Sequence, residues 1–307
     1  GLTMTCASHI NADGKGFPGQ LGIFSDEHIE GHRRLVNAIQ AEGSLAVIQL
    51  HHAGMRSPRD LINQAPLCPS ADEKTGSRAL SLEEVETLRD DFIQAANRAQ
   101  KSGYDGVEIH GAHGYILCQF LSATYNRRTD RYGGSLENRS RILFEIIDGI
   151  REQCGAGFLV GVRLSPERFG MRLNETLALS QELMKTGKID FLDISLWDCF
   201  KEPNEEDYKG RSLLSYFTEI KRNDVKLTVA GKIMNGSDVK SILDSGIDFV
   251  SIGRAAILRH DFPLRVLADS NYQSPSLPVT SDHLKKEGLS PTFVQYMRRW
   301  KGFVVDK

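Results

Sequence analysis

Short apolar runs alternate along the chain with longer stretches in which apolar residues recur at helical spacing. This alternation is typical of a parallel sheet that is covered by helices. The predicted strands are Leu2–Ser8, Leu45–Leu50, Asp105–His110, Phe158–Leu164, Ile189–Ser195, Lys226–Ala230 and Ile247–Ile252. The hydrophobic pattern therefore predicts seven strands joined by helices.

The stretches between these runs predict helices, two of which have recognisable starts. One helix is expected over Ser25–Ala41 and another over Ser81–Lys101, where Ser81 and Glu84 match the two halves of a capping box. Left-handed caps are expected at the glycines that follow four helix ends, at positions 43, 103, 187 and 246. The other predicted helices are Asn138–Cys154, Asn174–Lys185, Leu213–Arg222, Ser237–Ser245 and Phe262–Ser270.

This repeat is compatible with two architectures. A parallel (β/α)8 barrel of the TIM type needs eight strands, so in that case we expect the first strand to lie upstream of residue 1. The alternative is an open, doubly wound sheet of seven strands. In the barrel interpretation, residues 1–270 form the barrel and residues 271–307 form a C-terminal extension that packs on the barrel or on a neighbouring subunit.

Composition narrows the class of partner. With 40% hydrophobic and 25% charged residues, the 307-residue chain can bury a large core. Its net charge of −2 gives no electrostatic signature for nucleic acid or for an anionic membrane. The expected partner is therefore a small molecule. The five cysteines are scattered and odd in number, which argues against a disulfide framework or a metal cluster and for a cytoplasmic protein.

The end of the third predicted strand has the most distinctive chemistry. His110, His113 and Tyr115 follow the apolar run within six residues, and glycines at 111 and 114 interrupt the strand pattern there. The spacing of the two histidines could form half of a metal site, but no further ligand follows at a familiar spacing, so no metal is expected. Ordinary packing of the histidines also remains open at this point.

Other strand ends carry polar anchors. Gly231 follows the sixth strand and Gly253 with Arg254 follows the seventh, the region where such barrels bind phosphate. A glycine-terminated strand with a surface arginine is the alternative. Gln49 and Arg163 lie inside apolar strands, where a structural ion pair or hydrogen bond is as compatible with the sequence as contact with a ligand.

The longest motif identifies a family resemblance. The run from Asn126 to Ser135 reads NRRTDRYGGS, and it follows the run from Gly106 to Tyr115, which reads GVEIHGAHGY. Together with QLHHAG at 49–54 and SIGR at 251–254, these runs closely resemble the Old Yellow Enzyme family of flavin-dependent ene-reductases. The resemblance extends through nearly the whole chain.

The resemblance implies an eight-stranded barrel that binds FMN, takes hydride from NADPH or NADH and passes it to the activated C=C bond of an α,β-unsaturated carbonyl compound. His110 and His113 would bind the carbonyl oxygen, and Tyr115 would donate a proton, as a phenol with an ordinary pKa of about 10 can do at neutral pH. The implied flavin contacts are Ala7 against the ring system, Gln49 and Arg163 at the pyrimidine, and Gly231, Gly253 and Arg254 at the phosphate.

Two other functions remain open from the sequence. The same barrel and flavin could oxidise amines or related substrates, or a barrel without its first strand could act as a non-catalytic binding or assembly module. The run Ser290–Val305 has apolar residues at near-helical spacing and predicts a packing or subunit-contact helix, so a homo-oligomer is compatible with the sequence.

Overall fold

The computed structural model describes residues 1–305, which form two compact units. Unit one comprises Gly1–Ser195, Pro203–Lys209 and Glu219–Lys226. Unit two comprises Leu196–Glu202, Gly210–Thr218 and the residues from Leu227 onward. Among residues 1–305 no helix is long and apolar enough to cross a membrane.

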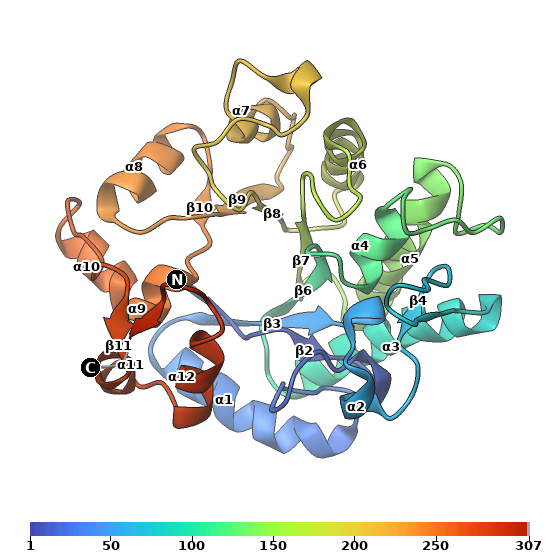
Figure 1. Cartoon of the computed structure of the whole chain (residues 1–307), viewed down its shortest axis with the longest axis horizontal. Helices are drawn as coiled ribbons and strands as arrows, with labels where there is room; N and C mark the ends of the chain where they lie inside the picture. Colours follow the sequence, from blue (N-terminus) through green and yellow to red (C-terminus); the bar gives the residue numbers. More distant parts are fainter. Residues whose placement is uncertain (306–307) are drawn as a thin grey trace. The chain divides into compact units, whose positions relative to one another are not determined.

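Unit one is built on a parallel sheet. Its strands are hydrogen-bonded in the order β1-β3-β6-β7-β8, and β2 pairs with β3 beyond the end of β1 (Figure 1). These strands pair in parallel, as the sequence pattern predicts. The strands are β1 (Leu2–Met4), β2 (Ser8–His9), β3 (Leu45–His51), β6 (Gly106–Gly111), β7 (Leu159–Leu164) and β8 (Phe191–Ser195).

The first predicted strand, Leu2–Ser8, is divided in two. Met4 pairs with Val47 and Ser8 pairs with Leu50, so four residue steps on one strand correspond to three on the other. One extra residue must therefore bulge out between β1 and β2. The sequence pattern gave no sign of this interruption.

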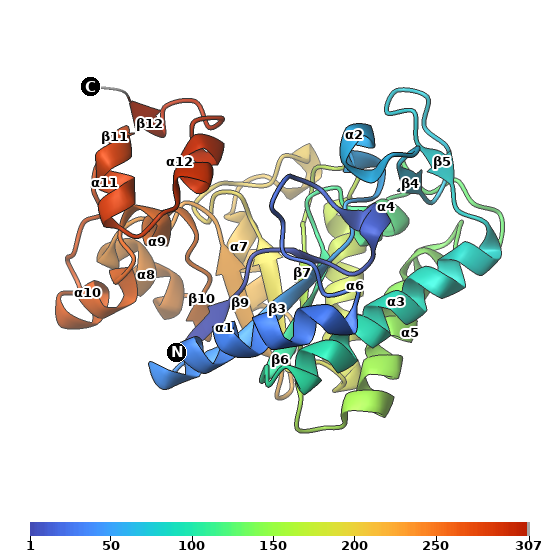
Figure 2. The same ribbon diagram turned by 90° about the horizontal axis from the view of Figure 1, so that it is seen from below.

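Helices cover the outer side of the sheet in unit one (Figure 1). In Figure 2, α1 and α3 run side by side, and the two helices contact each other. The capping box predicted at Ser81 and Glu84 is present, with both of its hydrogen bonds formed. The helices are α1 (Ile29–Ala41), α2 (Arg59–Ile62), α3 (Leu82–Lys101), α4 (Ile116–Leu121), α5 (Leu136–Cys154) and α6 (Leu173–Thr186).

The strands of unit one pack with the helices to form its core. All six residues of β6 are buried, and Val47, Ile109 and Val162 from three adjacent strands have no exposed side-chain surface. Removing such apolar surface from water is the main driving force for this packing. The short elements that the pattern did not predict include η1 (Ala12–Gly14), η3 (Gly54–Arg56), β4 (Leu67–Cys68), β5 (Arg78–Ala79) and η4 (Glu206–Tyr208). The predicted helix Ser25–Ala41 begins with a 3-10 turn, η2 (Asp26–His28).

Unit two contains the last two predicted strands, which pair in parallel. They are β9 (Lys226–Ala230), whose first residue belongs to unit one, and β10 (Phe249–Val250). Its other elements are α7 (Leu213–Thr218), α8 (Gly236–Asp244), α9 (Arg254–Leu258), α10 (Phe262–Ala268), β11 (Val279–Thr280), α11 (Ser281–Lys286), α12 (Pro291–Met297) and β12 (Val304–Val305).

The C-terminal part of unit two has a small apolar cluster of its own. Leu284, Val294, Met297 and Phe303 pack together there, where Figure 2 shows α11, α12, β11 and β12 grouped. The helix predicted from residue 290 ends at Met297, because the chain then turns so that β12 can pair with β11. The proposed domain boundary at residue 270 stays a prediction.

Candidate active site

The register of four strands in unit one places the predicted polar residues side by side. His110 on β6 pairs with Arg163 on β7, which in turn pairs with Asp193 on β8. Gln49 on β3 pairs with Glu108, two residues before His110. Because paired residues of parallel strands project to the same face and residues i and i+2 also share a face, these five side chains form one polar group.

His110 is buried without a partner. Its side chain is 3% exposed, and within residues 1–305 neither ring nitrogen has a hydrogen-bond partner. Burial, with smaller contributions from His113, His51, Arg163 and Arg56, lowers the pKa of His110 well below its usual value. The ring is therefore neutral at physiological pH. A neutral imidazole has one donor and one acceptor nitrogen, and leaving both unpaired in a protein interior is costly unless a ligand binds there.

A left-handed turn brings His113 and Tyr115 beside this ring. His113 has a φ of 60° and Gly114 a φ of 72°, and the helix α4 begins directly after Tyr115. The His110 ring centroid is 5.1 Å from that of His113 and 5.2 Å from that of Tyr115. The three side chains that the sequence singled out therefore lie together. In the part of the chain that the structure describes, no group of three or more metal-ligating side chains accompanies them.

Two residues that the sequence interpretation missed also surround Tyr115. The ring of His51, at the end of β3, meets the Tyr115 ring edge-on at 4.3 Å between centroids. The guanidinium of Arg56 lies 4.9 Å from the Tyr115 ring centroid, in cation–π geometry, and donates a hydrogen bond to the His113 carbonyl. The alternation of β3 is the signal that could have shown His51, because it shares a face with Gln49.

Arg163 connects this group to β8. Its Nε lies 3.3 Å from Asp193 Oδ2, in an ion pair, and its Nη2 donates to Ser195 Oγ at 3.4 Å. The same hydroxyl lies 2.6 Å from His113 Nε2. Burial, then Arg163, Arg56 and Arg168, lowers the pKa of His113 to about 3, so this ring is neutral as well. Nη1 of Arg163 has no hydrogen bond within residues 1–305.

Gln49 is held by a buried acid that the sequence interpretation also missed. Its Nε2 donates a hydrogen bond to Glu108 Oε2. Glu108 has no exposed surface, and burial together with the neighbouring Asp193 carboxylate raises its pKa to about 8, against the opposing effects of Arg163 and Gln49. A neutral Glu108 avoids placing two carboxylates beside a single arginine.

The remaining predicted flavin contacts are divided between the two units. In unit one, Ala7 lies between β1 and β2, and its carbonyl accepts a hydrogen bond from Gln20. In unit two, a Cβ at Gly231 would meet backbone atoms of residues 197 and 198 at 2.8–2.9 Å, so only glycine fits there. Gly253 is the N-cap of α9, and the side chain of Arg254, the first residue of that helix, has no hydrogen bond or ion pair within residues 1–305.

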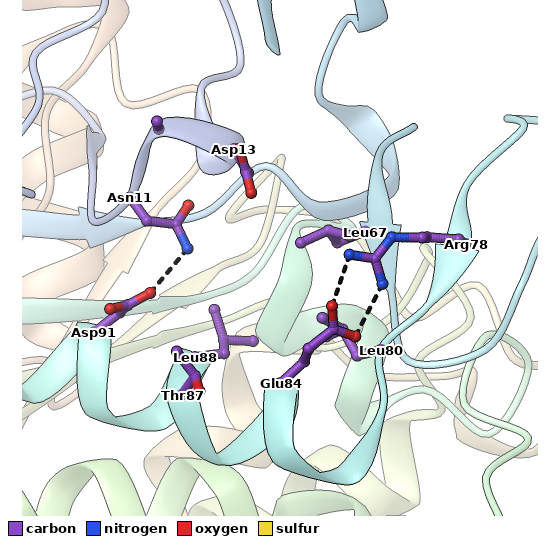
Figure 3. A pocket seen from close by; sticks show the side chains of 10 residues that line it. Asn11, Asp13, Leu67, Arg78, Leu80, Glu84, Thr87, Leu88 and Asp91 are labelled. Atoms are coloured by element: carbon purple, nitrogen blue, oxygen red, sulfur yellow. Dashed lines mark hydrogen bonds and ion pairs between the residues drawn. The ribbon is translucent and has the colours of Figure 1, made fainter. Parts of the chain in front are cut away.

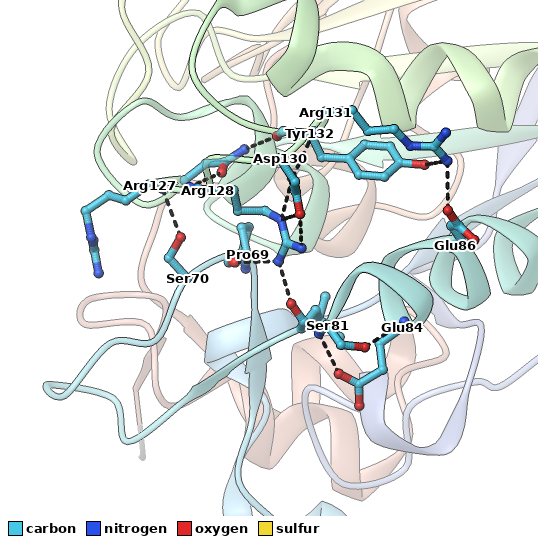
Figure 4. A network of polar contacts seen from close by, with 12 residues as sticks. Pro69, Ser70, Ser81, Glu84, Glu86, Arg127, Arg128, Asp130, Arg131 and Tyr132 are labelled. Atoms are coloured by element: carbon cyan, nitrogen blue, oxygen red, sulfur yellow. Dashed lines mark hydrogen bonds and ion pairs between the residues drawn. The ribbon is translucent and has the colours of Figure 1, made fainter.

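The long motif at 126–135 makes a network of polar contacts with the segments before and at the start of α3 (Figure 4). Arg128 donates to the carbonyls of Pro69 and Leu80 at 2.9 and 2.5 Å and pairs with Asp130. Asn126 donates to the carbonyl of Phe120 in α4, the helix that Tyr115 precedes. The motif therefore has a structural role, because it holds α4, the helix that follows Tyr115.

A separate pocket of about 310 Å³ lies at the start of α3 (Figure 3). Four of its polar side chains are already paired: Arg78 Nη2 with Glu84 Oε1 at 2.7 Å, and Asn11 Nδ2 with Asp91 Oδ2 at 2.9 Å. None of the residues predicted for the site lines it. The unpaired imidazole of His110, beside Tyr115, is the better candidate for catalysis.

Comparisons with known proteins agree with this arrangement. Residues 1–273 match the NADH:flavin oxidoreductase / NADH oxidase family. A probable NADH-dependent flavin oxidoreductase, YqiG of Bacillus subtilis (strain 168), is 37% identical over 277 residues, covering 87% of this chain and 74% of that protein.

Solved structures are similar over most of the chain. The Old Yellow Enzyme homologue from Zymomonas mobilis has a TM-score of 0.78 and 28% identity, covering 92% of this chain and 82% of that chain. Morphinone reductase in complex with tetrahydroNAD has a TM-score of 0.76 and 28% identity, covering 92% and 81%. These matches confirm the predicted α/β fold class of the TIM-barrel type. The chain belongs to the NADH:flavin oxidoreductase / NADH oxidase family, of the Old Yellow Enzyme kind, whose oxidoreductases use FMN with NAD(P)H as hydride donor.

Proposed function

We propose that this enzyme reduces the activated C=C bond of α,β-unsaturated carbonyl compounds. The observation that carries the proposal is His110, a buried neutral imidazole with two unpaired nitrogens beside the Tyr115 ring. An N–H group directed at a carbonyl oxygen stabilises the negative charge that develops there when the alkene accepts hydride.

The residues of unit one fit a flavin. Arg163 retains a free N–H group at Nη1, and its positive charge favours an electron-rich edge of a heterocycle. Gln49, on the same face of the sheet, offers an amide that can form further hydrogen bonds to the ring. We assign the phosphate to Gly231, Gly253 and Arg254, since the Arg254 guanidinium is without a partner in the described chain, and the ring system to the neighbourhood of Ala7. When bound, FMN supplies the hydride chemistry.

The chain's own side chains then perform two tasks. His110 and His113 bind the substrate oxygen, which polarises the enone towards attack at its β-carbon. Tyr115 donates a proton to the α-carbon as general acid. Arg56 and His51, packed against the Tyr115 ring, hold that phenol in place. These five side chains lie in one cluster around the Tyr115 ring.

The test is a pair of half-reactions with the FMN-loaded protein. We expect anaerobic NADPH or NADH to bleach the flavin absorbance and 2-cyclohexenone to restore it. A protein that cannot be loaded with FMN, or a reduced flavin that oxygen reoxidises but no enone does, contradicts the proposal. A methylated amine serves as the comparison substrate, because amine oxidation would instead bleach the oxidised flavin.

A further inference from the structure

Ser195 connects a cation to the imidazole of His113. It is the last residue of β8, and its hydroxyl oxygen lies 3.4 Å from Arg163 Nη2 and 2.6 Å from His113 Nε2. No functional role followed from the sequence for Ser195. The three residues come from β7, β8 and the loop after β6, all within unit one.

The direction of these hydrogen bonds follows from the hydrogens available. A guanidinium can only donate, so Arg163 must use the Ser195 oxygen as an acceptor. The hydroxyl then has one hydrogen to donate, and within residues 1–305 its one remaining polar contact is His113 Nε2. Donation to His113 Nε2 gives this hydrogen a protein acceptor, whereas accepting a second bond from His113 would leave it without one, so donation is the favoured direction. An imidazole that accepts at Nε2 carries its proton at Nδ1.

We propose that Ser195 is a positioning residue that fixes His113 as the neutral tautomer protonated at Nδ1, so that this histidine offers an N–H donor to the substrate oxygen. The tautomer itself is independent of the reaction, whereas its use as a donor rests on the proposed function. Without the serine hydrogen, the ring could instead present a bare Nδ1, which would repel a carbonyl oxygen.

The protein leaves the ring of His113 few other constraints. The backbone of His113 is held separately, by its N–H to Ser165 Oγ at 2.9 Å and by its carbonyl, which accepts from Arg56. The low pKa of His113 excludes the doubly protonated imidazolium at neutral pH. The choice between the two neutral tautomers therefore depends on the Ser195 contact.

The tautomer can be read directly by NMR of the holoprotein with labelled histidine nitrogens. Two-bond correlations between ring hydrogens and nitrogens distinguish a protonated from an unprotonated nitrogen, and the His113 signals are identified by their loss in His113→Asn. We expect Nδ1 protonated and Nε2 unprotonated in the wild type. In Ser195→Ala the proton should move wholly or partly to Nε2, whereas Ser195→Thr, which keeps the hydroxyl, should retain the wild-type pattern.

Ser165→Ala is the matched control, because it removes a buried hydroxyl that contacts the backbone of His113 and not its ring. It should leave the His113 nitrogens as in the wild type. A wild-type His113 protonated at Nε2 overturns the proposal, and so does an unchanged proton position in folded Ser195→Ala. If Ser195→Ala does not fold, the wild-type and Ser195→Thr spectra decide.

Kinetics provide a second readout. Ser195→Ala should lower kcat/KM for 2-cyclohexenone roughly ten-fold, the order of one hydrogen bond to a group that gains charge, and Ser195→Thr should recover most of it. Equal rates for wild type and folded Ser195→Ala would contradict a donor role for His113. If the wild-type enzyme reduces no enone, the proposed function fails, while the spectra still judge the tautomer.

Discussion

Single residues determine the chemistry of the site through burial. His110 and His113 are kept neutral because a charged imidazole is poorly solvated there and cations lie nearby. Glu108 is kept neutral for the same reason, with Asp193 as the like charge beside it. Neutral groups in this position can donate or accept single hydrogen bonds without adding charge to the cluster.

The carboxyl of Glu108 should make the stability of the protein depend on pH. Its pKa is about 8 when folded, compared with 4.5 for an ordinary glutamate, so the folded state binds more protons between those values. The stabilisation is complete below about pH 4.5 and is lost as the pH rises through 8. We expect the free energy of unfolding to fall across this window and to fall less steeply in Glu108→Gln.

Thermal and urea unfolding at a series of pH values measures this effect. The exposed Glu83 provides the control, because Glu83→Gln removes a carboxyl of the same type from the surface and should leave the slope unchanged. Parallel pH profiles for wild type and Glu108→Gln would show that Glu108 is ionised in the folded protein.

At the scale of elements, the motif at 126–135 acts as a structural clamp. The side chain of Arg128 is 8% exposed. It donates hydrogen bonds to two carbonyls in the segments before α3 and forms an ion pair with Asp130. Gly133 packs so closely on Arg128 that a Cβ there would lie 2.1 Å from the Arg128 carbonyl oxygen. The loop conformation therefore depends on both residues.

Two arginines of this motif should differ sharply in their contribution to stability. Arg128→Ala leaves two buried carbonyls without their arginine donor and removes the cation that pairs with Asp130, so we expect a loss of roughly 3 kcal/mol in the free energy of unfolding. Arg131 pairs with Glu86 on the surface, with 49% and 40% of their side chains exposed, so Arg131→Ala should cost about 1 kcal/mol or less. Equal losses in the free energy of unfolding, measured with urea, would show that the contacts of Arg128 do not stabilise this loop more than a surface ion pair does.

At the scale of the whole molecule, the sequence predicted the strands and long helices well. Seven strands and the alternation with helices are confirmed among residues 1–305, because apolar runs and caps are local signals. The bulge after Met4 and the short helix α4 after Tyr115 were missed, since tertiary contacts determine them. The roles of Glu108 and Ser195 could not be predicted, because they depend on contacts between strands that lie far apart in the sequence. His51 shares a face with Gln49 on β3, and that alternation could have shown it.

FMN binding should stabilise the whole chain by mass action. At one hundred times its dissociation constant, a ligand adds about 2.7 kcal/mol to the free energy of unfolding. We expect FMN to raise Tm more than riboflavin does, because riboflavin lacks the phosphate that we assign to Arg254. In Arg254→Ala the two ligands should become nearly equal, whereas Arg265→Ala, which removes a cation from the nearby helix α10, should preserve the difference.

Absence of any Tm shift with FMN would favour a non-catalytic module on this fold. A preference for FMN that survives Arg254→Ala would move the phosphate site elsewhere in the chain. Either outcome is visible without an activity assay.

The central claim, that this cluster protonates an unsaturated carbonyl substrate, is tested most directly by the two half-reactions of Tyr115→Phe. Stopped-flow absorbance should show flavin reduction by NADPH or NADH at nearly the wild-type rate, because no proton from Tyr115 is needed in that step. Reoxidation by 2-cyclohexenone should slow by about 100-fold or more, the range of a lost general acid. Equal slowing of both half-reactions, or an unchanged reoxidation rate, would contradict the assignment of Tyr115 as the proton donor.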